Sequence, residues 1–338
     1  MSDFPPGKLP HSVLDRLLKS YTGNDPRLIV PPALGEDAAV IDFGDRYLVA
    51  KTDPITFATS DIGWYAVHVN ANDIAAMGAT PRFFLATILI PADQATEALI
   101  ESIFRSIYEA AAALDITVCG GHTEITPGLD RPLVIGQMLG EVKPDRLVRS
   151  SGLEAGDAIL LTKGLGIEAT AIIAHEKGPE LEAQGIEPAL LEEGRAFLHN
   201  PGISVVRDAR IALDQGGVSA LHDPTEGGLA GALDELARAS NTGIEINADK
   251  VHIYPETNAI CAALELDPWG LIASGALLIT SKPGGSSSII EALSNSDIPA
   301  SVIGKITHPE LGLVRTQNGE TAPLPTFERD EIARLYSQ

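Results

Sequence analysis

Short apolar segments with strand and helix periodicity alternate along the whole chain, and this alternation limits the fold more than any other feature. Apolar residues three and four positions apart predict an amphipathic helix over residues 9–21. The patterns over 38–43 and 46–51 predict two strands joined by a hairpin turn at Gly44-Asp45. Because both halves of the chain mix strands and helices, we predict an α+β (mixed α/β) fold.

The rest of the chain reads in the same way, with a turn-rich linker over 24–32. Further strands are expected at 82–90, 116–118, 133–142, 158–162, 218–221, 244–246, 276–279 and 301–306. Further helices are expected at 62–78, at 93–114 with Asp93 as N-cap, at 167–175, 188–198 and 204–215, from the 223–228 loop to Ser240, and from Phe327 onward. The polar, glycine-rich stretch 149–157 suggests a boundary, so we expect an N-terminal helix and linker at 1–30 and domains at 31–150 and 151–338.

The chain is acidic, with 24 basic and 46 acidic side chains, a net charge of -22 and no basic stripe. We therefore expect neither nucleic-acid binding nor attraction to an anionic membrane. A solubilising surface accounts for most of these acids. Carboxylates near a phosphate ligand would repel it unless a divalent cation stood between them.

Cysteine use and apolar run lengths indicate the compartment. Two cysteines, Cys119 and Cys261, cannot form a disulfide framework, so we expect a reducing environment. Cys119 has no basic sequence neighbour and is expected to be a buried core thiol. The first residues show no leader pattern, and the longest apolar runs, such as 83–91, are too short to span a bilayer. We expect a cytoplasmic protein.

Acidic residues stand beside Gly or Asn at the ends of apolar elements in the first half. Asp37 precedes the first hairpin strand and Asp53 follows the second, so the hairpin could bring them close. Asn70 and Asp73 lie three apart and share a helix face. Oxygen ligands of this kind suit Mg²⁺. Each acid alone could instead be a turn residue, a cap or a solvated side chain.

Two glycine pairs could offer backbone N–H groups to an anion. Gly120-Gly121 follows a short strand, and its alternative role is a tight turn. The segment 223–228 precedes a helix and resembles an anion site at a helix N-terminus, with N-capping by Asp223 or Thr225 as the alternative. Because His122 and His222 adjoin these segments, either could be a proton donor or a structural residue.

Four segments together resemble the PurM-like (AIR synthase-related) superfamily, which includes AIR synthase, thiamine-monophosphate kinase, selenophosphate synthetase and the hydrogenase maturation factor HypE. They are Gly-Glu-Asp-Ala-Ala at 35–39, Thr-Asp-Pro at 52–54, Asn-Asp-Ile-Ala-Ala-Met-Gly-Ala at 72–79 and His-Asp-Pro-Thr-Glu-Gly-Gly at 222–228. The start, Gly-Lys-Leu-Pro at 7–10, is most similar to the HypE branch. The resemblance covers about residues 7–305.

The resemblance implies a two-domain fold in which N-terminal domains pair into a β-barrel in a homodimer and the C-terminal domain is an α/β sandwich. It implies ATP at that interface, with Mg²⁺ held by Asp37, Asp53 and Asp73. The residues expected around the nucleotide and its phosphates are Gly35, Lys51, Thr52, Asn70, Asn72, Gly120, Gly121, Thr123, Thr225, Gly227 and Gly228. The candidate catalytic residues are His122, His222 and Asp223.

Three departures separate this chain from the HypE pattern. The chain ends Leu-Tyr-Ser-Gln where HypE has Pro-Arg-Ile-Cys with its carbamoyl-carrying thiol. It reads Ala-Ser-Gly-Ala at 273–276 where HypE has Asn-Glu-Gly-Lys with a catalytic Glu. His122 stands where the family often has an acid, with Glu124 two residues further on.

We therefore expect an ATP- and Mg²⁺-dependent enzyme that activates an oxygen of an unidentified small substrate, and not a carbamoyl dehydratase. The alternatives are a thiamine-monophosphate-kinase-like activity, a non-catalytic nucleotide-binding scaffold, and a purely structural acidic dimer.

Overall fold

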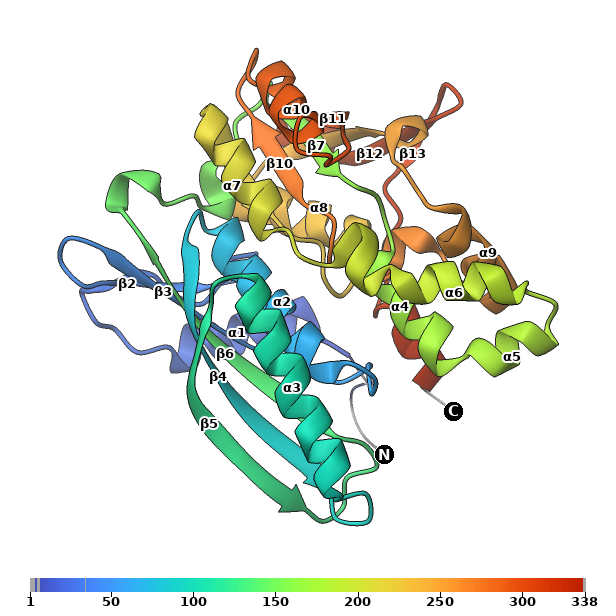
Figure 1. Cartoon of the computed structure of the whole chain (residues 1–338). Helices are drawn as coiled ribbons and strands as arrows, with labels where there is room; N and C mark the ends of the chain where they lie inside the picture. Colours follow the sequence, from blue (N-terminus) through green and yellow to red (C-terminus); the bar gives the residue numbers. More distant parts are fainter. Residues whose placement is uncertain (1–3, 5–6, 34, 337–338) are drawn as a thin grey trace. The chain divides into compact units, whose positions relative to one another are not determined.

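The computed structural model describes residues 4, 7–33 and 35–336, which divide into two compact units (Figure 1). The smaller unit comprises residues 25–31 and 37–147, and the larger unit comprises the described parts of 1–24, 32–36 and 148–338. Each unit combines one β-sheet with helices, so the mixed α/β fold is confirmed. Two predictions made from the sequence, on a leader segment at the start and on the last four residues, fall partly on residues 1–3, 5–6 and 337–338. These residues lie outside the described part of the chain.

The smaller unit is a six-stranded sheet with two helices. Its elements are β1 (Leu28–Val30), β2 (Ala39–Asp42), β3 (Tyr47–Ile55), α2 (Ile62–Ala76), β4 (Thr80–Pro91), α3 (Glu97–Ala113), β5 (Thr117–Thr126) and β6 (Leu133–Val142). The strand order is β1-β2-β3-β6-β4-β5, and only β4 and β5 pair in parallel. The predicted hairpin is confirmed, because β2 and β3 pair with Asp42 opposite Tyr47.

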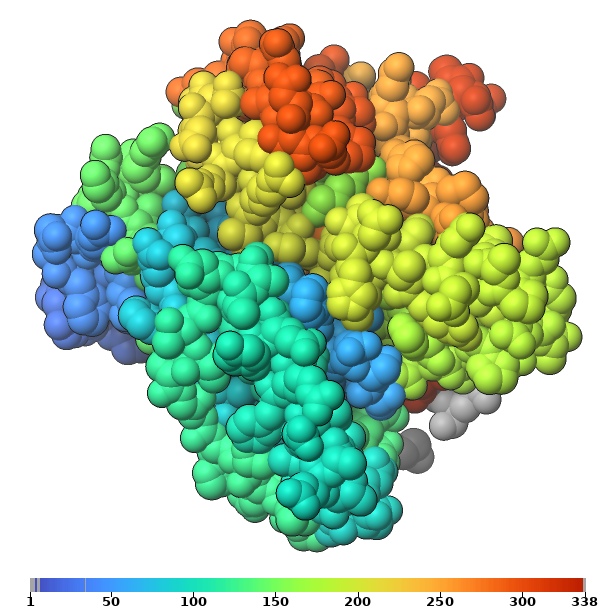
Figure 2. Space-filling model, in the orientation of Figure 1, coloured from blue at the N-terminus to red at the C-terminus, as the bar shows by residue number. Residues whose placement is uncertain are grey.

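Helix α2 is buried along almost its whole length, because it lies between the sheet and α3. It has apolar residues on all sides, as expected of a fully enclosed helix. Three polar residues, Asn70, Asn72 and Asp73, are nevertheless buried in it. Helix α3 packs on α2 through Ile103 and Ile107, and its outer face forms part of the surface in Figure 2 (teal). Buried polar groups in α2 require partners, which makes this helix a candidate for function.

The larger unit is a seven-stranded sheet of order β13-β12-β9-β11-β7-β10-β8. Its strands are β7 (Ala158–Thr162), β8 (Val218–His222), β9 (Gly243–Asn247), β10 (Leu278–Ser281), β11 (Ala300–Thr307), β12 (Leu313–Gln317) and β13 (Glu320–Pro323). Its helices are α1 (His11–Tyr21), α4 (Ile167–Glu176), α5 (Gly178–Ala183), α6 (Pro188–Ala196), α7 (Val206–Gln215), α8 (Gly228–Ser240), α9 (Pro255–Leu264) and α10 (Ser286–Ser294), with a final 3₁₀ turn at Glu331–Tyr336.

The core of the larger unit forms where α8 covers the sheet. Leu229, Leu233 and Leu236 project from one side of α8 and pack among Ile159 and Ile244 of the strands. All five side chains are almost fully buried. Burying aliphatic side chains of this size stabilises the unit by about 1.5–3 kcal/mol each. This packing fixes the start of α8, where the glycine pair 227–228 lies.

Several boundaries predicted from the sequence are wrong. The linker over 24–32 contains strand β1, which pairs with β2. Helix α3 begins at Glu97, because Thr96 Oγ1 accepts a hydrogen bond from the backbone N–H of Leu99 at 3.2 Å, so Asp93 is not the cap. Asp53 lies inside β3 and does not follow it.

The expected turn at Gly120-Gly121 is also wrong, because β5 runs through both glycines. Cys119 is skipped in the pairing, since Val118 lies opposite Phe84 and Gly120 opposite Leu85, which forms a bulge. Gly121 has φ +149°, and a Cβ there would lie 2.0 Å from the Ala86 carbonyl oxygen. Close approach of two backbones is therefore what requires glycine at position 121. Cys119 is exposed, and Cys261 is the buried thiol.

No helix in the described ranges combines the length and apolar content needed to cross a bilayer.

Candidate functional site

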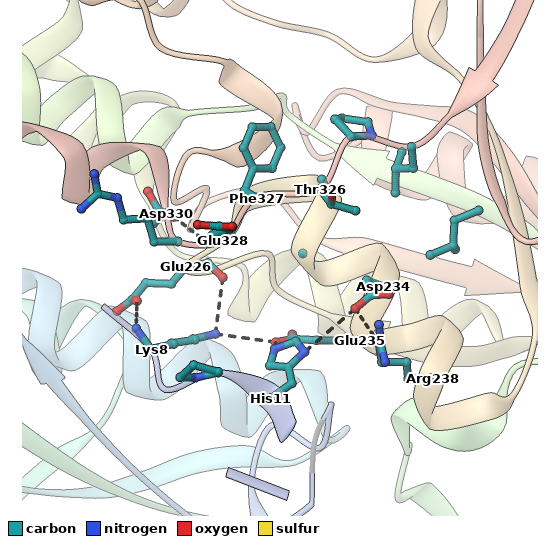
Figure 3. Close-up of a pocket in the computed structure, with 18 of the residues that line it drawn as sticks. Lys8, His11, Glu226, Asp234, Glu235, Arg238, Thr326, Phe327, Glu328 and Asp330 are labelled. Atoms are coloured by element: carbon teal, nitrogen blue, oxygen red, sulfur yellow. Dashed lines mark hydrogen bonds and ion pairs between the residues drawn. The ribbon is translucent and has the colours of Figure 1, made fainter. Parts of the chain in front are cut away.

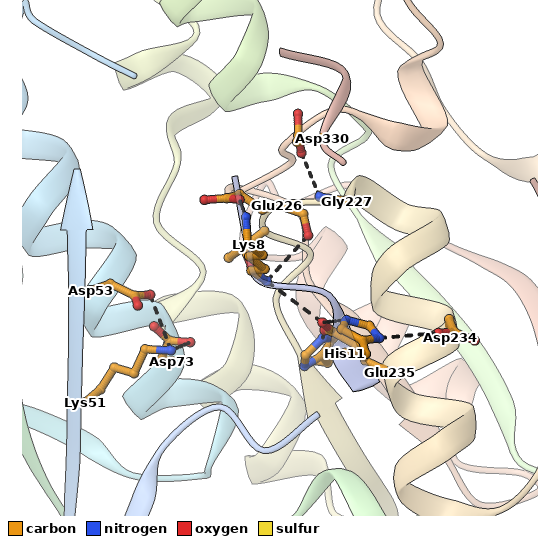
Figure 4. A network of polar contacts seen from close by, with 12 residues as sticks. Lys8, His11, Lys51, Asp53, Asp73, Glu226, Gly227, Asp234, Glu235 and Asp330 are labelled. Atoms are coloured by element: carbon orange, nitrogen blue, oxygen red, sulfur yellow. Dashed lines mark hydrogen bonds and ion pairs between the residues drawn. The ribbon is translucent and has the colours of Figure 1, made fainter. Parts of the chain in front are cut away.

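Carboxylates of the smaller unit converge around one lysine (Figure 4). The Lys51 Nζ lies 3.3 Å from Asp53 Oδ2 and 3.2 Å from Asp73 Oδ1. Carboxylate oxygens of Asp37 and Asp73 lie within 4.8 Å of each other. Asp37 and Asp73 are 8% and 3% exposed, so their negative charges are held close together away from water. The three acids singled out in the sequence are thus neighbours in one unit.

The fold of the smaller unit explains this convergence. Asp37 precedes β2, and Asp53 lies on the paired strand β3 beyond Ala50, which pairs with Ala39. Both acids therefore lie at the open end of the hairpin. Asn70 joins α2 to β3, because its Oδ1 accepts from the Asp53 N–H at 2.9 Å and its Nδ2 donates to the Asp53 carbonyl at 3.3 Å. Its Nδ2 also donates to the Ala66 carbonyl at 2.8 Å. Asn70 thereby sets the position of Asp73, one helical turn along.

Thr52 and Asn72 have different surroundings. Thr52 Oγ1 donates to the Gly136 carbonyl at 2.8 Å, across the β3–β6 pair. A Cβ at Gly136 would lie 2.4 Å from Asn70 Nδ2, so glycine leaves room for that amide. Asn72 is completely buried in α2. These hydrogen bonds give Thr52 and Asn70 a structural role. Their expected contact with a nucleotide stays a prediction.

The predicted residues at the first glycine pair, Gly120 to Thr123, lie on the open edge strand β5. His122 Nε2 lies 3.5 Å from Glu124 Oε2, and both side chains are exposed. These residues therefore form an exposed strand edge, and their expected contact with phosphates stays a prediction.

In the larger unit, His222 is held by an acid of α8. Its Nε2 lies 3.1 Å from Glu235 Oε2, and its side chain is 5% exposed. Glu235 also lies 3.6 Å from His11 Nε2 and 3.9 Å from Lys8 Nζ (Figure 4). Burial alone would raise the pKa of Glu235, but hydrogen bonds from His11 and His222 and the charge of Lys8 hold it well below its usual range. Glu235 is thus an anionic anchor for the N-terminal segment.

Gly35 packs against the same helix. It has φ +79°, and a Cβ there would lie 2.9 Å from the Glu235 carbonyl oxygen. Close packing on α8 explains glycine at this position, and its expected contact with a nucleotide stays a prediction.

The start of α8 carries an anion from the same chain. Gly227 is the N-cap residue with φ +92°, and no side chain of Asp223 or Thr225 caps the helix, so that alternative is wrong. Instead, the Gly227 N–H donates to Asp330 Oδ2 at 2.6 Å. Burial raises the pKa of Asp330 to about 7 against hydrogen bonds from Gly227, Ile332 and Ile272, and the charge of Glu226 raises it further. A carboxylate at a helix N-terminus is the arrangement that the glycine pair suggested, but its source is the C-terminal segment.

A cavity of about 670 Å³ lies beside this helix start (Figure 3). Its walls come from the N-terminal segment at Lys8–Ser12, the exposed side of α8 and the C-terminal segment at 323–330. Lys8 N donates to Glu226 Oε2 at 3.1 Å across its rim. Cavities of this size hold small ligands.

Sequence reasoning missed one further acid, Glu168, in the second position of α4. It is 3% exposed, and burial raises its pKa to about 7, with Ser274 opposing the shift and the charges of Asp330 and Asp223 adding to it. The available signal was a single Glu inside the apolar run Ile-Glu-Ala-Thr-Ala-Ile-Ile-Ala at 167–174. An acid enclosed by apolar residues on a buried helix is uncommon without a role.

Family models match both parts of the chain. The N-terminal domain of the AIR synthase related proteins matches residues 35–142, and their C-terminal domain matches residues 154–314. A putative hydrogenase expression/formation protein of Methanocaldococcus jannaschii is 30% identical over 287 residues, 82% of each chain. A selenide, water dikinase of Dechloromonas aromatica is 31% identical over 264 residues, 76% of this chain and 71% of the relative.

Solved structures agree on the fold. The hydrogenase maturation protein HypE in complex with ATP superposes with a TM-score of 0.72 at 23% identity and covers 98% of both chains. The predicted resemblance and the two-domain PurM-like fold are thereby confirmed. With both domain models matched in order and relatives aligned over most of their length, this chain belongs to the AIR synthase related protein family.

Proposed function

We propose that this chain is an ATP- and Mg²⁺-dependent enzyme that activates an oxygen of a small substrate by transfer of the γ-phosphoryl group. The observation that carries the proposal is the convergence of Asp37, Asp53 and Asp73 in the smaller unit. A selenide, water dikinase among the relatives and a HypE structure with ATP among the neighbours support the same chemistry.

The three acids fit a cation on their own geometry. The Lys51 ammonium lies between Asp53 and Asp73, where the two carboxylates favour a positive charge. Buried carboxylates as close as Asp37 and Asp73 repel each other unless a cation or a proton intervenes. Mg²⁺ bound there would neutralise the charge of a nucleotide's phosphates, and positioning with charge neutralisation accounts for most catalysis in phosphoryl transfer.

A homodimer is part of the proposal. Strand β5 ends the sheet order, and its residues 117–125 are all exposed. Phe83, Val118 and Ile125 are exposed apolar residues on β4 and β5. An open edge with apolar side chains is a surface for strand pairing, and two copies of one chain pair most simply about a two-fold axis. A cytoplasmic location is also part of the proposal, and the free thiols of Cys119 and Cys261 fit its reducing environment.

The proposal is tested by calorimetric titration of the full chain with a non-hydrolysable ATP analogue, with and without Mg²⁺, followed by a screen of ADP release against small metabolites. We expect binding that requires Mg²⁺ and ADP release that rises with one class of acceptor. Binding with no turnover for any acceptor would favour the nucleotide-binding scaffold. No binding in either condition would favour the structural dimer and reject the proposal.

A further inference from the structure

The cavity beside the start of α8 is built by the larger unit alone (Figure 3). The N-terminal segment at Lys8–Ser12, helix α8 and the C-terminal segment at 323–330 all belong to that unit. The acids proposed to hold Mg²⁺ belong to the smaller unit, and none of them lines the cavity. The proposed function therefore gives this cavity no part, and its chemistry can be considered by itself.

Part of the cavity lining is apolar and held by the core of the larger unit. Ala230, Leu313 and Leu324 line the cavity, and each belongs to the core cluster or packs against it. Phe327 lines it as well and packs on the same core. A Cβ at Gly270 would lie 2.7 Å from the Phe327 ring, so the ring rests directly on the Gly270 backbone. Close packing thus gives a ligand a fixed hydrocarbon surface in this cavity.

The basic side chains of the N-terminal segment and of α8 are paired with acids of α8. Glu235 Oε1 lies 3.9 Å from Lys8 Nζ and 3.6 Å from His11 Nε2. Arg238 Nε donates to Asp234 Oδ2 at 2.6 Å. These bases neutralise the two acids that α8 contributes to the lining, so this side of the cavity carries little net charge.

The other charged residues of the lining are mostly acids. They are Glu226, Glu328 and Asp330, with Arg329 as the one further base in the lining. This excess of carboxylates would repel a ligand that carries a negative charge. It favours a ligand with a positive charge.

Asp330 is the acid of this group that the fold holds most firmly. It is 3% exposed, and its carboxylate accepts from the N–H groups of Gly227 at 2.6 Å and Ile332 at 2.9 Å, with a further backbone hydrogen bond from Ile272. A carboxylate has about four lone pairs, so these bonds leave one unused. No ion pair of the described residues includes Asp330. A buried carboxylate without a counter-charge lowers stability, and a cation bound from outside would reduce that cost.

We propose that the cavity binds an organic amine, whose ammonium group donates to the Asp330 carboxylate and whose hydrocarbon part lies against Leu324 and Phe327. A neutral apolar molecule would leave the carboxylate without a counter-charge, and an anion would be repelled by it. The site is independent of the proposed phosphoryl transfer, because its lining contains none of the acids of the smaller unit. Since three segments form the lining, a bound amine would also hold the N-terminal and C-terminal segments against α8.

The experiment uses four probes that share a phenethyl skeleton. Phenethylamine carries a positive charge and N–H donors, and its N-trimethylated derivative carries the charge alone. Phenethyl alcohol is neutral, and phenylpropionate is an anion. Calorimetric titration of the full chain at pH 8 measures the four affinities. At this pH both partners are charged, because burial raises the pKa of Asp330 to about 7 and alkylammonium groups lose their proton only near about pH 10.

Three variants and a second measurement locate the binding. Asp330→Asn removes the charge and keeps an oxygen that can accept from the Gly227 N–H. Phe327→Leu keeps an apolar side chain and removes the ring. Glu291→Gln changes an exposed acid of α10 that does not line the cavity and serves as the matched control. Hydrogen exchange of the wild type, with and without phenethylamine, shows which segments the amine protects.

We expect the wild type and Glu291→Gln to bind phenethylamine about tenfold or more tightly than the alcohol, with the trimethylated probe between them and no binding of phenylpropionate. Affinity for phenethylamine should fall by about tenfold or more in Asp330→Asn and by about two- to tenfold in Phe327→Leu. The amine should raise the protection of amides in α1 and in residues 324–336. It should leave β2 and β3 of the smaller unit unchanged.

Equal affinities of the wild type for the amine and the alcohol would overturn the proposal, as would unchanged amine affinity in Asp330→Asn. If Asp330→Asn does not fold, the exchange measurement decides, because protection that rises only outside α1 and residues 324–336 places the amine elsewhere. A wild type that binds none of the four probes would reject the amine site and leave the proposed function in place. Loss of ATP-analogue binding alone would reject the proposed function and leave the amine site in place.

Discussion

The Asp330 Oδ2 accepts a 2.6 Å hydrogen bond from the backbone N–H of Gly227, across 103 positions of sequence. The bond closes the start of α8 with a carboxylate from the C-terminal segment, and Asp330 Oδ1 accepts a second one from the Ile332 N–H at 2.9 Å. A helix whose own loop supplies no cap therefore depends on a distant residue.

Replacing Asp330 should destabilise the larger unit. Asp330→Ala leaves the half-buried Gly227 N–H without its acceptor, which costs about 1–3 kcal/mol of the free energy of unfolding. Asp330→Asn should cost less, because its amide oxygen can accept the same bond. Urea unfolding at pH 6 measures the difference, with the exposed Glu328→Ala as control. Equal stability of Asp330→Ala and wild type would show that the bond does not hold the segment.

The pH dependence of stability should change in Glu168→Gln. The folded-state pKa of Glu168 is about 7, above its ordinary value of 4.5, so its stabilising contribution is complete below pH 4.5 and is lost as pH rises through 7. Between pH 4.5 and about pH 7, the free energy of unfolding should fall by about 3 kcal/mol more in the wild type than in Glu168→Gln. Parallel stability curves for the two proteins in urea titrations would contradict the raised pKa. Glu193→Gln, which changes an exposed acid of α6, serves as control and should follow the wild type.

Asp37→Asn and Asp73→Asn should each weaken Mg²⁺-ATP binding and keep the fold. Each change removes one charged oxygen ligand, and charged contacts of this kind are worth about 1.5–3 kcal/mol, or on the order of tenfold or more in affinity. Asp45→Asn, in the exposed hairpin turn, serves as control. Calorimetry with circular dichroism separates binding from folding. Full affinity in both variants would count against the cation site.

The N-terminal segment should loosen at alkaline pH. The hydrogen bond to Glu235 raises the pKa of His11 above 6.5, against burial, and the charges of Glu235 and Asp234 add to the shift. A raised histidine pKa stabilises fully below 6.5, and this contribution disappears as pH rises through the folded-state value. Hydrogen exchange of α1 amides, corrected for intrinsic rates, should show lower protection at pH 9 than at pH 6. In His11→Ala this pH difference should vanish, whereas the exposed His308→Ala should retain it.

Helix α3 should depend on Thr96 and not on Asp93. Thr96→Ala removes the Oγ1 that accepts from the Leu99 N–H and should cost about 1 kcal/mol of the free energy of unfolding. Asp93→Ala should leave stability within about 0.5 kcal/mol, as for most surface changes. Urea midpoints of the two variants compare them directly, and the reverse order would restore Asp93 as the cap.

The sequence by itself determined the local elements and the first set of acids. The hairpin around Gly44-Asp45 and the apolar helix α2 follow from periodicity and turn chemistry, which act over a few residues. Asp37 and Asp73 stood out as members of a set of acids at apolar elements that matches a family pattern, and the fold places them together.

Only the tertiary structure decided which distant residues meet. Nothing near the 223–228 loop indicates that Asp330 caps α8, and nothing near Glu168 indicates that Ser274, Asp330 and Asp223 act on its pKa. The full length of the edge strand β5 could likewise not be recognised, because Gly121, which signals a turn in the sequence, is required there by the close approach of Ala86. Periodicity reports the neighbours of a residue along the chain, whereas burial, hydrogen-bond partners and pKa depend on segments that only packing brings together.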